Sequence, residues 1–433
     1  MDHRITELDS GVRVVTEAMP SVRSTALAFW IATGSIAEEE SQAGLSHLLE
    51  HMLFRGTDRF ASVEIDQIFD AMGAEINAGT SKDTTSVYTR VLDRHLQRAF
   101  DVLSDMVWRP SLGELEAERE VVLEEIAMYE DDPQDRVFDL LGEAVFGDHP
   151  LGRPVIGRAE VVGQTDRATL SAFHRQRYIA SHIVVAAAGS LDHDKLVALT
   201  ESSLGDGPPS GGELSSPPPP TGQMPVRVRF DTKDTEQYHV CLGGRGIARD
   251  DDRRFALRVL DNILGGTSSS RLFQEVRERR GLAYSVFSFS NMFAGAGQIG
   301  VYVGTRPENL TPALAVVGEE LRRFVEQAAT EEELARSREN VKGRTVLALE
   351  STSTRMNRLG SSLLAGMPIL SLDEVIERID AVTLEQVRDL AGSLFDPASL
   401  SAAGIGPDEA AYRAALGAVS APLSDAPDPG ATP

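Results

Sequence analysis

The chain has 433 residues, of which 42% are hydrophobic and 25% charged, and its formal net charge is −24. This composition is typical of a globular protein with more than one domain, whereas the acidic balance argues against nucleic acids and anionic membrane surfaces as partners. No apolar run approaches the ~20 residues that span a bilayer, and the N-terminus lacks the apolar core of a signal peptide. A single cysteine, Cys241, excludes an intrachain disulfide. We therefore expect a cytoplasmic protein.

The first predicted elements are strands, two helices and a hairpin. Residues 12–16 and 24–33 predict strands. The stretch 44–54, G-L-S-H-L-L-E-H-M-L-F, has apolar residues at helical spacing and predicts a helix. A second helix is expected over 62–72, and the β-branched and aromatic residues of 74–92 predict a hairpin.

Three side chains of the helix at 44–54 can carry chemistry. His47 and His51 are four residues apart, so their imidazoles lie on one face, one turn apart, and Glu50 lies beside them. Two imidazoles and a carboxylate can hold a divalent metal and supply a base for its water. The order H-x-x-E-H is the inverted form of a zinc peptidase motif. The alternative is an ordinary helix with two surface or core histidines, so a third ligand is needed.

Further helices are predicted at 94–107 and 112–130, followed by one or two more helices and a strand at 183–188. Residues 205–222 are rich in Gly and Pro, with four consecutive prolines near the end, which is typical of a linker. The composition after 421 predicts a disordered tail. The expected organisation is an N-terminal half at 1–204, a linker at 205–222, a C-terminal half at 223–420 and a tail at 421–433.

The two halves resemble copies of each other. A shift of 211 residues places the H-x-x-E-H helix on residues 258–264 and keeps its apolar positions. Its three polar side chains are not kept and become Arg258, Asp261 and Asn262. We therefore expect the metal set in the first copy only.

The acidic helix at 112–130 offers the third ligand. At about 100° per residue, Glu118 and Glu125 share one face with several apolar side chains. Burying two unpaired carboxylates on that face is unfavourable, and a metal ion, or histidines bound to one, would compensate for their burial. In the second copy a shift of 219 replaces them by Ser337 and Arg344, so they are lost together with the histidines. The alternative is a solvated charged helix.

Three features together resemble the pitrilysin/insulinase family of zinc peptidases. They are the stretch G-L-S-H-L-L-E-H-M-L-F-R-G-T, the segment E-R-E-V-V-L-E-E at 118–125, and the tandem repeat. The chain is most similar to the short branch of the family, which includes the mitochondrial processing peptidase β subunit and bacterial relatives. The resemblance covers residues 10–415.

The resemblance implies a set of roles. His47, His51 and Glu125 would bind one zinc ion, Glu50 would be the catalytic base, and Glu118 would support the site from behind the ligands. The chain would then be a zinc-dependent metalloendopeptidase that hydrolyses unfolded or short peptides through a metal-activated water.

Two more segments resemble family elements. The letters L-F-Q-E-V-R-E-R-R-G-L-A-Y resemble the family's arginine–tyrosine element, which implies that Arg277 and Tyr284 assist substrate binding and the transition state. The letters N-A-G-T begin with Asn77, Ala78 and Gly79 and resemble the family's N-A-x-T segment, an edge strand on which substrate lies. Gly79 is smaller than the residue expected there.

The family fold is α+β, with two homologous α/β halves, each a mostly antiparallel sheet layered with helices, joined here by the Pro/Gly-rich linker. Longer members join two such units in one chain. A chain of this length is therefore expected to form a homodimer, or a heterodimer with a related subunit, and Tyr284 of one subunit would serve the metal site of the other. The alternatives are a non-catalytic scaffold or peptide-holding member of the fold, and a zinc hydrolase acting on non-peptide amides.

Overall fold

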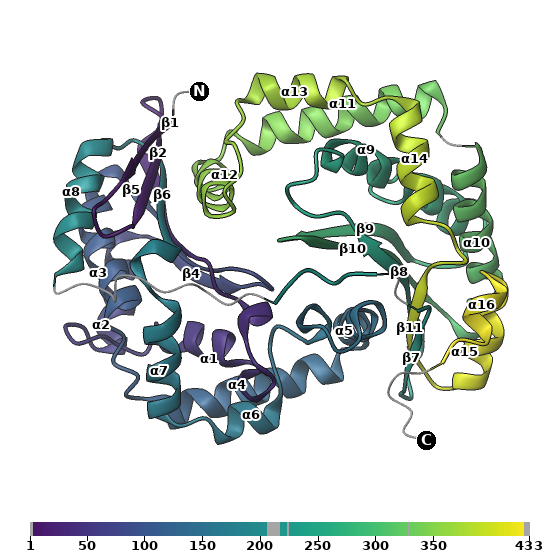
Figure 1. The fold of residues 1–433 in the computed structure, drawn as a ribbon, viewed down its shortest axis with the longest axis horizontal. Helices are drawn as coiled ribbons and strands as arrows, with labels where there is room; N and C mark the ends of the chain where they lie inside the picture. Colours follow the sequence, from purple (N-terminus) through teal and green to yellow (C-terminus); the bar gives the residue numbers. More distant parts are fainter. Residues whose placement is uncertain (1–2, 206–216, 223–224, 328, 428–433) are drawn as a thin grey trace. The chain divides into compact units, whose positions relative to one another are not determined.

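The computed structural model describes residues 3–205, 217–222, 225–327 and 329–427 (Figure 1). These residues form two compact units, each built around one sheet. Unit 1 takes its residues from 1–127, 154–217 and 345–372. Unit 2 takes its residues from 128–153, 218–344 and 373–433.

Unit 1 contains a six-stranded sheet in the order β1-β2-β6-β3-β5-β4. Neighbouring strands are antiparallel except for the parallel pair β2 and β6. The strands are β1 (His3–Glu7), β2 (Arg13–Ala18), β3 (Ser24–Ile31), β4 (Glu75–Thr80), β5 (Thr85–Leu92) and β6 (Ile183–Gly189). Strand β4 is therefore an edge strand, and its last residue closes the hairpin that the sequence predicts.

Helices cover both faces of this sheet. They are α1 (Leu45–Met52), α2 (Ser62–Met72), α3 (Leu96–Trp108), α4 (Leu115–Asp131), α6 (Ala159–Gln164), α7 (Arg167–Arg177), α8 (His193–Leu204) and α12 (Thr352–Leu364). The main core lies between the sheet and helices that include α1 and α3, and a smaller core lies under α12. A Cβ on Gly360 would come within 2.3 Å of the Trp30 ring, so this glycine lets α12 approach the sheet. Strand β6 is buried on both faces, which explains its continuous apolar sequence.

Unit 2 contains a five-stranded sheet in the order β7-β11-β8-β10-β9. Its strands are β7 (Val228–Thr232), β8 (Tyr238–Gly246), β9 (Ser285–Phe293), β10 (Ala296–Thr305) and β11 (Ser401–Gly406). Its helices are α5 (Pro133–Phe146), α9 (Arg254–Leu264), α10 (Leu310–Gln327), α11 (Glu331–Ala348), α13 (Leu372–Asp380), α14 (Leu384–Leu394), α15 (Glu409–Leu416) and α16 (Ala421–Ser424). The one parallel pair is β7 with β11.

The two sheets repeat one topology, which confirms the predicted fold of two homologous, mostly antiparallel α/β halves. Strands β2, β6, β3, β5 and β4 occur in the same order as β7, β11, β8, β10 and β9, and the parallel pair occupies the same place. Helices α5 and α12 also correspond, since each follows the long charged helix of its half, α4 or α11. Each one packs on the sheet built from the other half: α5 lies on β8 and β11, and α12 on β3 and β6 (Figure 1).

The structure differs from the sequence predictions near the chain ends. Strand β1 was not predicted. The prediction of a disordered tail from 421 is wrong for its first residues, because α16 forms there and Leu423 and Ala426 are buried. Residues 428–433 and most of the predicted linker lie outside the described residues.

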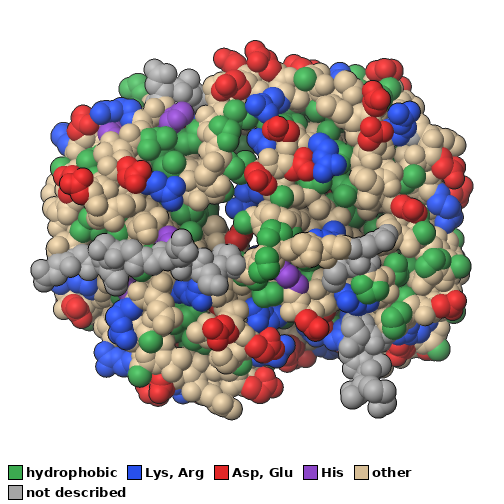
Figure 2. Space-filling model, viewed as in Figure 1, with side chains coloured by type: hydrophobic (Ala, Val, Ile, Leu, Met, Phe, Trp, Pro, Cys, Tyr) green, Lys and Arg blue, Asp and Glu red, His purple; other side chains and the backbone are tan. Residues whose placement is uncertain are grey.

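The surface is mixed in charge. On the face shown in Figure 2, acidic and basic side chains are interspersed over both units. Within the part of the chain that the structure describes, no helix combines the length and the apolar character needed to cross a membrane.

Candidate metal centre

Helix α1 is fixed in place by its apolar face and by its first turn. Leu48, Leu49 and Met52 are fully buried in the core of unit 1, so the histidines lie on the opposite, half-buried face. The helix begins after Gly44, whose φ of 104° favours glycine. The buried carboxylate of Glu38 accepts hydrogen bonds from the backbone N–H groups of Gly44 (2.9 Å) and of the residue two positions later (2.7 Å). A carboxylate at this end also complements the helix dipole.

The two imidazoles and one carboxylate converge on one point. The rings of His47 and His51 have centroids 4.7 Å apart. The Oε2 atom of Glu125 on α4 lies 3.2 Å from Nε2 of His51 and 3.7 Å from Nε2 of His47. Among the described residues, this is the one group of three or more His, Cys, Asp or Glu side chains close enough to share a metal ion, with ligand atoms within 4.8 Å of one another.

Glu118 holds His51 from behind. Its Oε1 atom lies 2.8 Å from Nδ1 of His51, and its other oxygen forms an ion pair with Arg55. Glu118 is 3% exposed, so this carboxylate is buried but has a partner on each oxygen. The pairing of a carboxylate with the outer nitrogen of a metal-binding histidine orients the ring and increases its basicity. The structure thus places both acidic residues of the predicted face of α4 around His51.

The donor atoms fit a divalent metal. A carboxylate can only accept hydrogen bonds, so Nδ1 of His51 carries the proton that faces Glu118. In the neutral ring Nε2 then has no proton, and its lone pair faces Glu125. Two acceptor atoms 3.2 Å apart need a cation or a proton between them. Burial, and then the neighbouring His51, lower the pKa of His47 to about 4, so its ring is neutral near neutral pH and can act as a ligand. Two imidazole nitrogens and a carboxylate oxygen are a common zinc set that leaves one coordination position open.

Glu50 lies on the same helix but outside this set of ligands. Its Oε2 atom accepts a hydrogen bond of 2.5 Å from the hydroxyl of Thr80, at the end of β4. Burial raises the pKa of Glu50, and the hydrogen bond from Thr80 opposes that rise. A carboxylate with a raised pKa next to a metal centre is suited to accept a proton from water.

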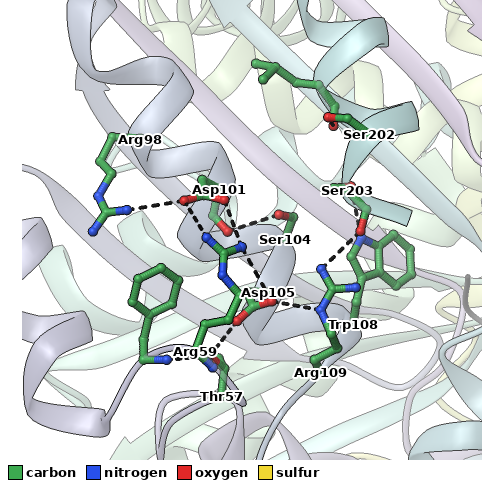
Figure 3. Close-up of polar contacts among 12 residues, drawn as sticks. Thr57, Arg59, Arg98, Asp101, Ser104, Asp105, Trp108, Arg109, Ser202 and Ser203 are labelled. Carbon is green, nitrogen blue, oxygen red and sulfur yellow. Dashed lines mark hydrogen bonds and ion pairs between the residues drawn. The ribbon is translucent and has the colours of Figure 1, made fainter. Parts of the chain in front are cut away.

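A buried carboxylate that the sequence analysis did not single out anchors the segment after α1 (Figure 3). Asp105 on α3 is fully buried and accepts hydrogen bonds from the Thr57 hydroxyl (2.6 Å) and from Nε of Arg109 (2.8 Å). Arg109 and Trp108 in turn donate to Ser203 at the end of α8. No sequence signal identifies this network, because its members come from distant segments.

The predicted arginine–tyrosine pair belongs to unit 2. Arg277 lies in a π-helical turn, η6 (Phe273–Glu278), an element that often occurs at functional sites. Its guanidinium lies 4.4 Å from the ring centroid of Tyr284 and donates to the carbonyl of that residue (3.1 Å). Tyr284 is 77% exposed, so its ring is held by Arg277 and presented to solvent.

The predicted substrate segment forms β4. Asn77 and Gly79 are exposed and Ala78 is half-buried, as the alternation of an edge strand requires. A Cβ built on Gly79 meets no atom within 4 Å. The missing side chain therefore leaves open space at this point of the strand.

The second copy keeps the helices and replaces the metal set. Asn262, at the position of His51, exchanges hydrogen bonds with Ser337 (2.8 Å) and Asn340 (2.9 Å). Asp261, at the position of Glu50, accepts a hydrogen bond from Ser288. Neutral hydrogen-bonding partners thus occupy the places of His51 and Glu118.

Fold and site together define a duplicated α/β protein with a candidate metal centre in its first copy. The sequence profile described as "Insulinase (Peptidase family M16)" matches residues 13–159, and that described as "Peptidase M16 inactive domain" matches residues 165–341. The chain belongs to the insulinase family, peptidase family M16.

Relatives agree with this assignment, and a solved structure shares the fold. An "uncharacterized zinc protease" of Streptomyces coelicolor is 43% identical over 399 residues, which are 90% of this chain and 86% of the relative. The protein YmxG of Bacillus subtilis, with the same description, is 40% identical over 388 residues, or 89% of this chain and 94% of the relative. The crystal structure of a Pseudomonas fluorescens "peptidase M16 inactive domain" has the same fold, with a TM-score of 0.88 at 23% identity over 94% of this chain and 99% of its own.

Proposed function

We propose that the chain is a cytoplasmic, zinc-dependent metalloendopeptidase that cleaves unfolded or short peptides. The observation that carries this proposal is the convergence of His47, His51 and Glu125, with Glu50 on the adjacent turn of the same helix. Membership of a family whose relatives are named zinc proteases supports it. The pairing of Glu118 with His51 supports it further, because that pairing orients a ligand.

In the proposed mechanism the chain holds the ion and moves the protons. His47, His51 and Glu125 would hold the zinc ion, which would act as a Lewis acid and lower the pKa of water at the site toward ~7. The Glu50 carboxylate accepts the proton of the attacking water and delivers it to the leaving amine. The raised pKa of Glu50 favours holding that proton between the two transfers. Glu118 keeps the lone pair of His51 Nε2 directed toward the centre.

Substrate recognition is proposed to use the free edge of β4. An extended peptide can add to such an edge as a further strand, and backbone hydrogen bonds then supply much of its affinity. The exposed positions Asn77 and Gly79 belong to this strand, and Thr80 at its end contacts Glu50. A peptide in this position must be extended, which favours unfolded or short substrates over folded proteins.

Tyr284 is proposed to act on the metal site of a second subunit, in a homodimer or in a heterodimer with a related chain. Its exposed ring and its support by Arg277 suit a residue that reaches a substrate outside its own unit. The test mixes Glu50→Gln and Tyr284→Phe chains after dissociation. If Tyr284 acts between copies of this chain, mixed dimers regain one complete site, and activity returns to about a quarter of the wild-type value. No recovery contradicts action between copies.

Hydrolysis is tested with zinc-loaded protein and a random peptide mixture, followed by mass spectrometry with and without chelator. Wild type is expected to produce cleavage products that chelator abolishes. Glu50→Gln is expected to bind zinc as wild type does and to yield no products. Continued cleavage by that variant removes Glu50 from the role of base.

A non-catalytic role is the second candidate, because residues 165–341 match a profile named for an inactive domain. A scaffold or peptide-holding protein would bind peptides without cleaving them. Zinc-loaded wild type that retains peptides intact after prolonged incubation would favour this candidate.

A further inference from the structure

The contact between Glu50 and β4 joins the proposed base to the proposed peptide-binding strand. The hydroxyl of Thr80 donates to Oε2 of Glu50 at 2.5 Å. An O–H to carboxylate bond of this length is charge-assisted and is among the stronger hydrogen bonds in proteins. No other side-chain hydrogen bond between α1 and β4 is found among the described residues.

The position of Thr80 follows that of strand β4. In the β4–β5 register, Thr80 lies opposite Thr85, whose hydroxyl is fully buried and donates to the carbonyl of Thr33 at 2.9 Å. The side chains of β4 alternate, so that Thr80 and Ala78 lie on the half-buried side and Gly79 on the exposed side. A threonine also has few χ1 rotamers. The direction of its hydroxyl therefore follows the position of the strand.

A neutral hydroxyl, that of Thr80, holds the Glu50 carboxylate on this side. Within the described ranges, no arginine or lysine forms an ion pair with Glu50. Tyr178 is buried, and burial and then the negative charge of Glu50 raise the pKa of its phenol, which stays neutral. A hydroxyl donor orients a carboxylate without forming an ion pair with it.

We propose that Thr80 is a positioning residue that couples the addition of a peptide at the free edge of β4 to the orientation of the Glu50 carboxylate. The inference rests on the proposed function. Edge strands are the less constrained strands of a sheet, and a peptide that pairs with β4 gives it hydrogen-bonded neighbours on both sides. The strand that binds the substrate then carries the hydroxyl that aligns the base. Alignment would be most complete when a peptide is bound.

The test compares Thr80→Val, which keeps the shape and removes the hydroxyl, with Thr80→Ser, which restores it. Thr80→Val is expected to lower kcat about 10- to 100-fold, as the loss of a hydrogen bond to a charged group predicts, with KM and zinc affinity within about threefold of wild type. Thr80→Ser is expected to recover kcat to within about threefold. The matched control is Thr89→Val, which removes a buried hydroxyl that bonds the Glu75 carbonyl in the same hairpin.

The result that overturns the inference is a kcat of Thr80→Val within about threefold of wild type, or a Thr80→Ser variant as slow as Thr80→Val. Crystal structures of zinc-loaded wild type, Thr80→Val and Thr80→Ser add a readout that does not depend on hydrolysis. The Glu50 carboxylate is expected to leave its position in Thr80→Val alone, and an unchanged position also overturns the inference. If wild type binds zinc but cleaves no peptide, the proposed function fails, while the structures still decide the role of Thr80.

Discussion

Replacing Glu118 by Gln tests how the chain prepares His51 for metal. Glu118 is buried, receives the Nδ1 proton of His51 at 2.8 Å and pairs with Arg55 through its other oxygen. A glutamine of the same shape has one acceptor and one donor end. If its oxygen faces His51, its amide N–H faces the donor Arg55. If it turns over, it donates to Nδ1 and forces the ring proton onto Nε2, where the metal should bind.

Either arrangement should weaken zinc binding by about 10- to 100-fold, the usual effect of losing a carboxylate behind a histidine ligand, or roughly 1.4–2.8 kcal/mol. The assay is competition with a chromophoric chelator at fixed pH. Glu120→Gln is the control, because Glu120 is an exposed carboxylate on the same helix and its change leaves His51 untouched. A zinc affinity of Glu118→Gln within about threefold of that control would refute the reasoning.

Three further changes probe the substrate strand and the two units. Gly79→Val should leave the unfolding midpoint unchanged or higher, since a Cβ there meets no atom within 4 Å, but should change cleavage preference in peptide mixtures; an unchanged product pattern would count against binding at β4. Burial raises the pKa of Glu333, but Arg271 and Thr330 outweigh it and hold the value at about 2. A lowered carboxyl pKa stabilises the fold above the unfolded pKa of ~4.3, and that stability is lost as pH falls toward 2. Glu333→Gln should therefore lower the free energy of unfolding by roughly 1–3 kcal/mol at pH 7. Measured by denaturant at a series of pH values, this free energy should fall less steeply below pH ~4 in the variant than in wild type; the same pH dependence in both proteins would contradict the role of Glu333. Asp105→Ala should lower the free energy of unfolding by roughly 1–3 kcal/mol, because Thr57 and Arg109 lose the acceptor of their hydrogen bonds; chemical denaturation that shows no loss would contradict the role of that network.

Much of the fold could be predicted because periodic patterns decide local structure. The apolar face of α1 and the alternation around β4 follow directly from the sequence. The repeat was visible as apolar positions kept at shifts of 211 and 219 residues, and the matching strand orders confirm it. The exchange of α5 and α12 between the two halves of the sequence could not be predicted, since no local pattern states which sheet an amphipathic helix covers.

The candidate site was predictable where the geometry of a single helix sets the direction in which its side chains project. His47, His51 and Glu50 share one helix, and Glu118 and Glu125 share one face of another, so spacing was sufficient to group each set. Contacts between distant segments were not predictable. Arg55 behind Glu118 and Thr80 beside Glu50 depend on how α1 packs against α4 and β4. The letters N-A-G-T marked the strand but gave no reason to assign its last hydroxyl to Glu50.

The central claim is that three side chains of unit 1 bind one zinc ion. The most direct test is metal analysis with zinc-edge X-ray absorption on wild type and on Glu125→Ala. Wild type should carry about one zinc per chain, with two imidazole nitrogens and carboxylate oxygen in its first shell, and Glu125→Ala should lose most of the metal under gentle purification. Wild type that holds less than about 0.2 zinc per chain after loading, or a first shell unchanged by Glu125→Ala, would contradict the account.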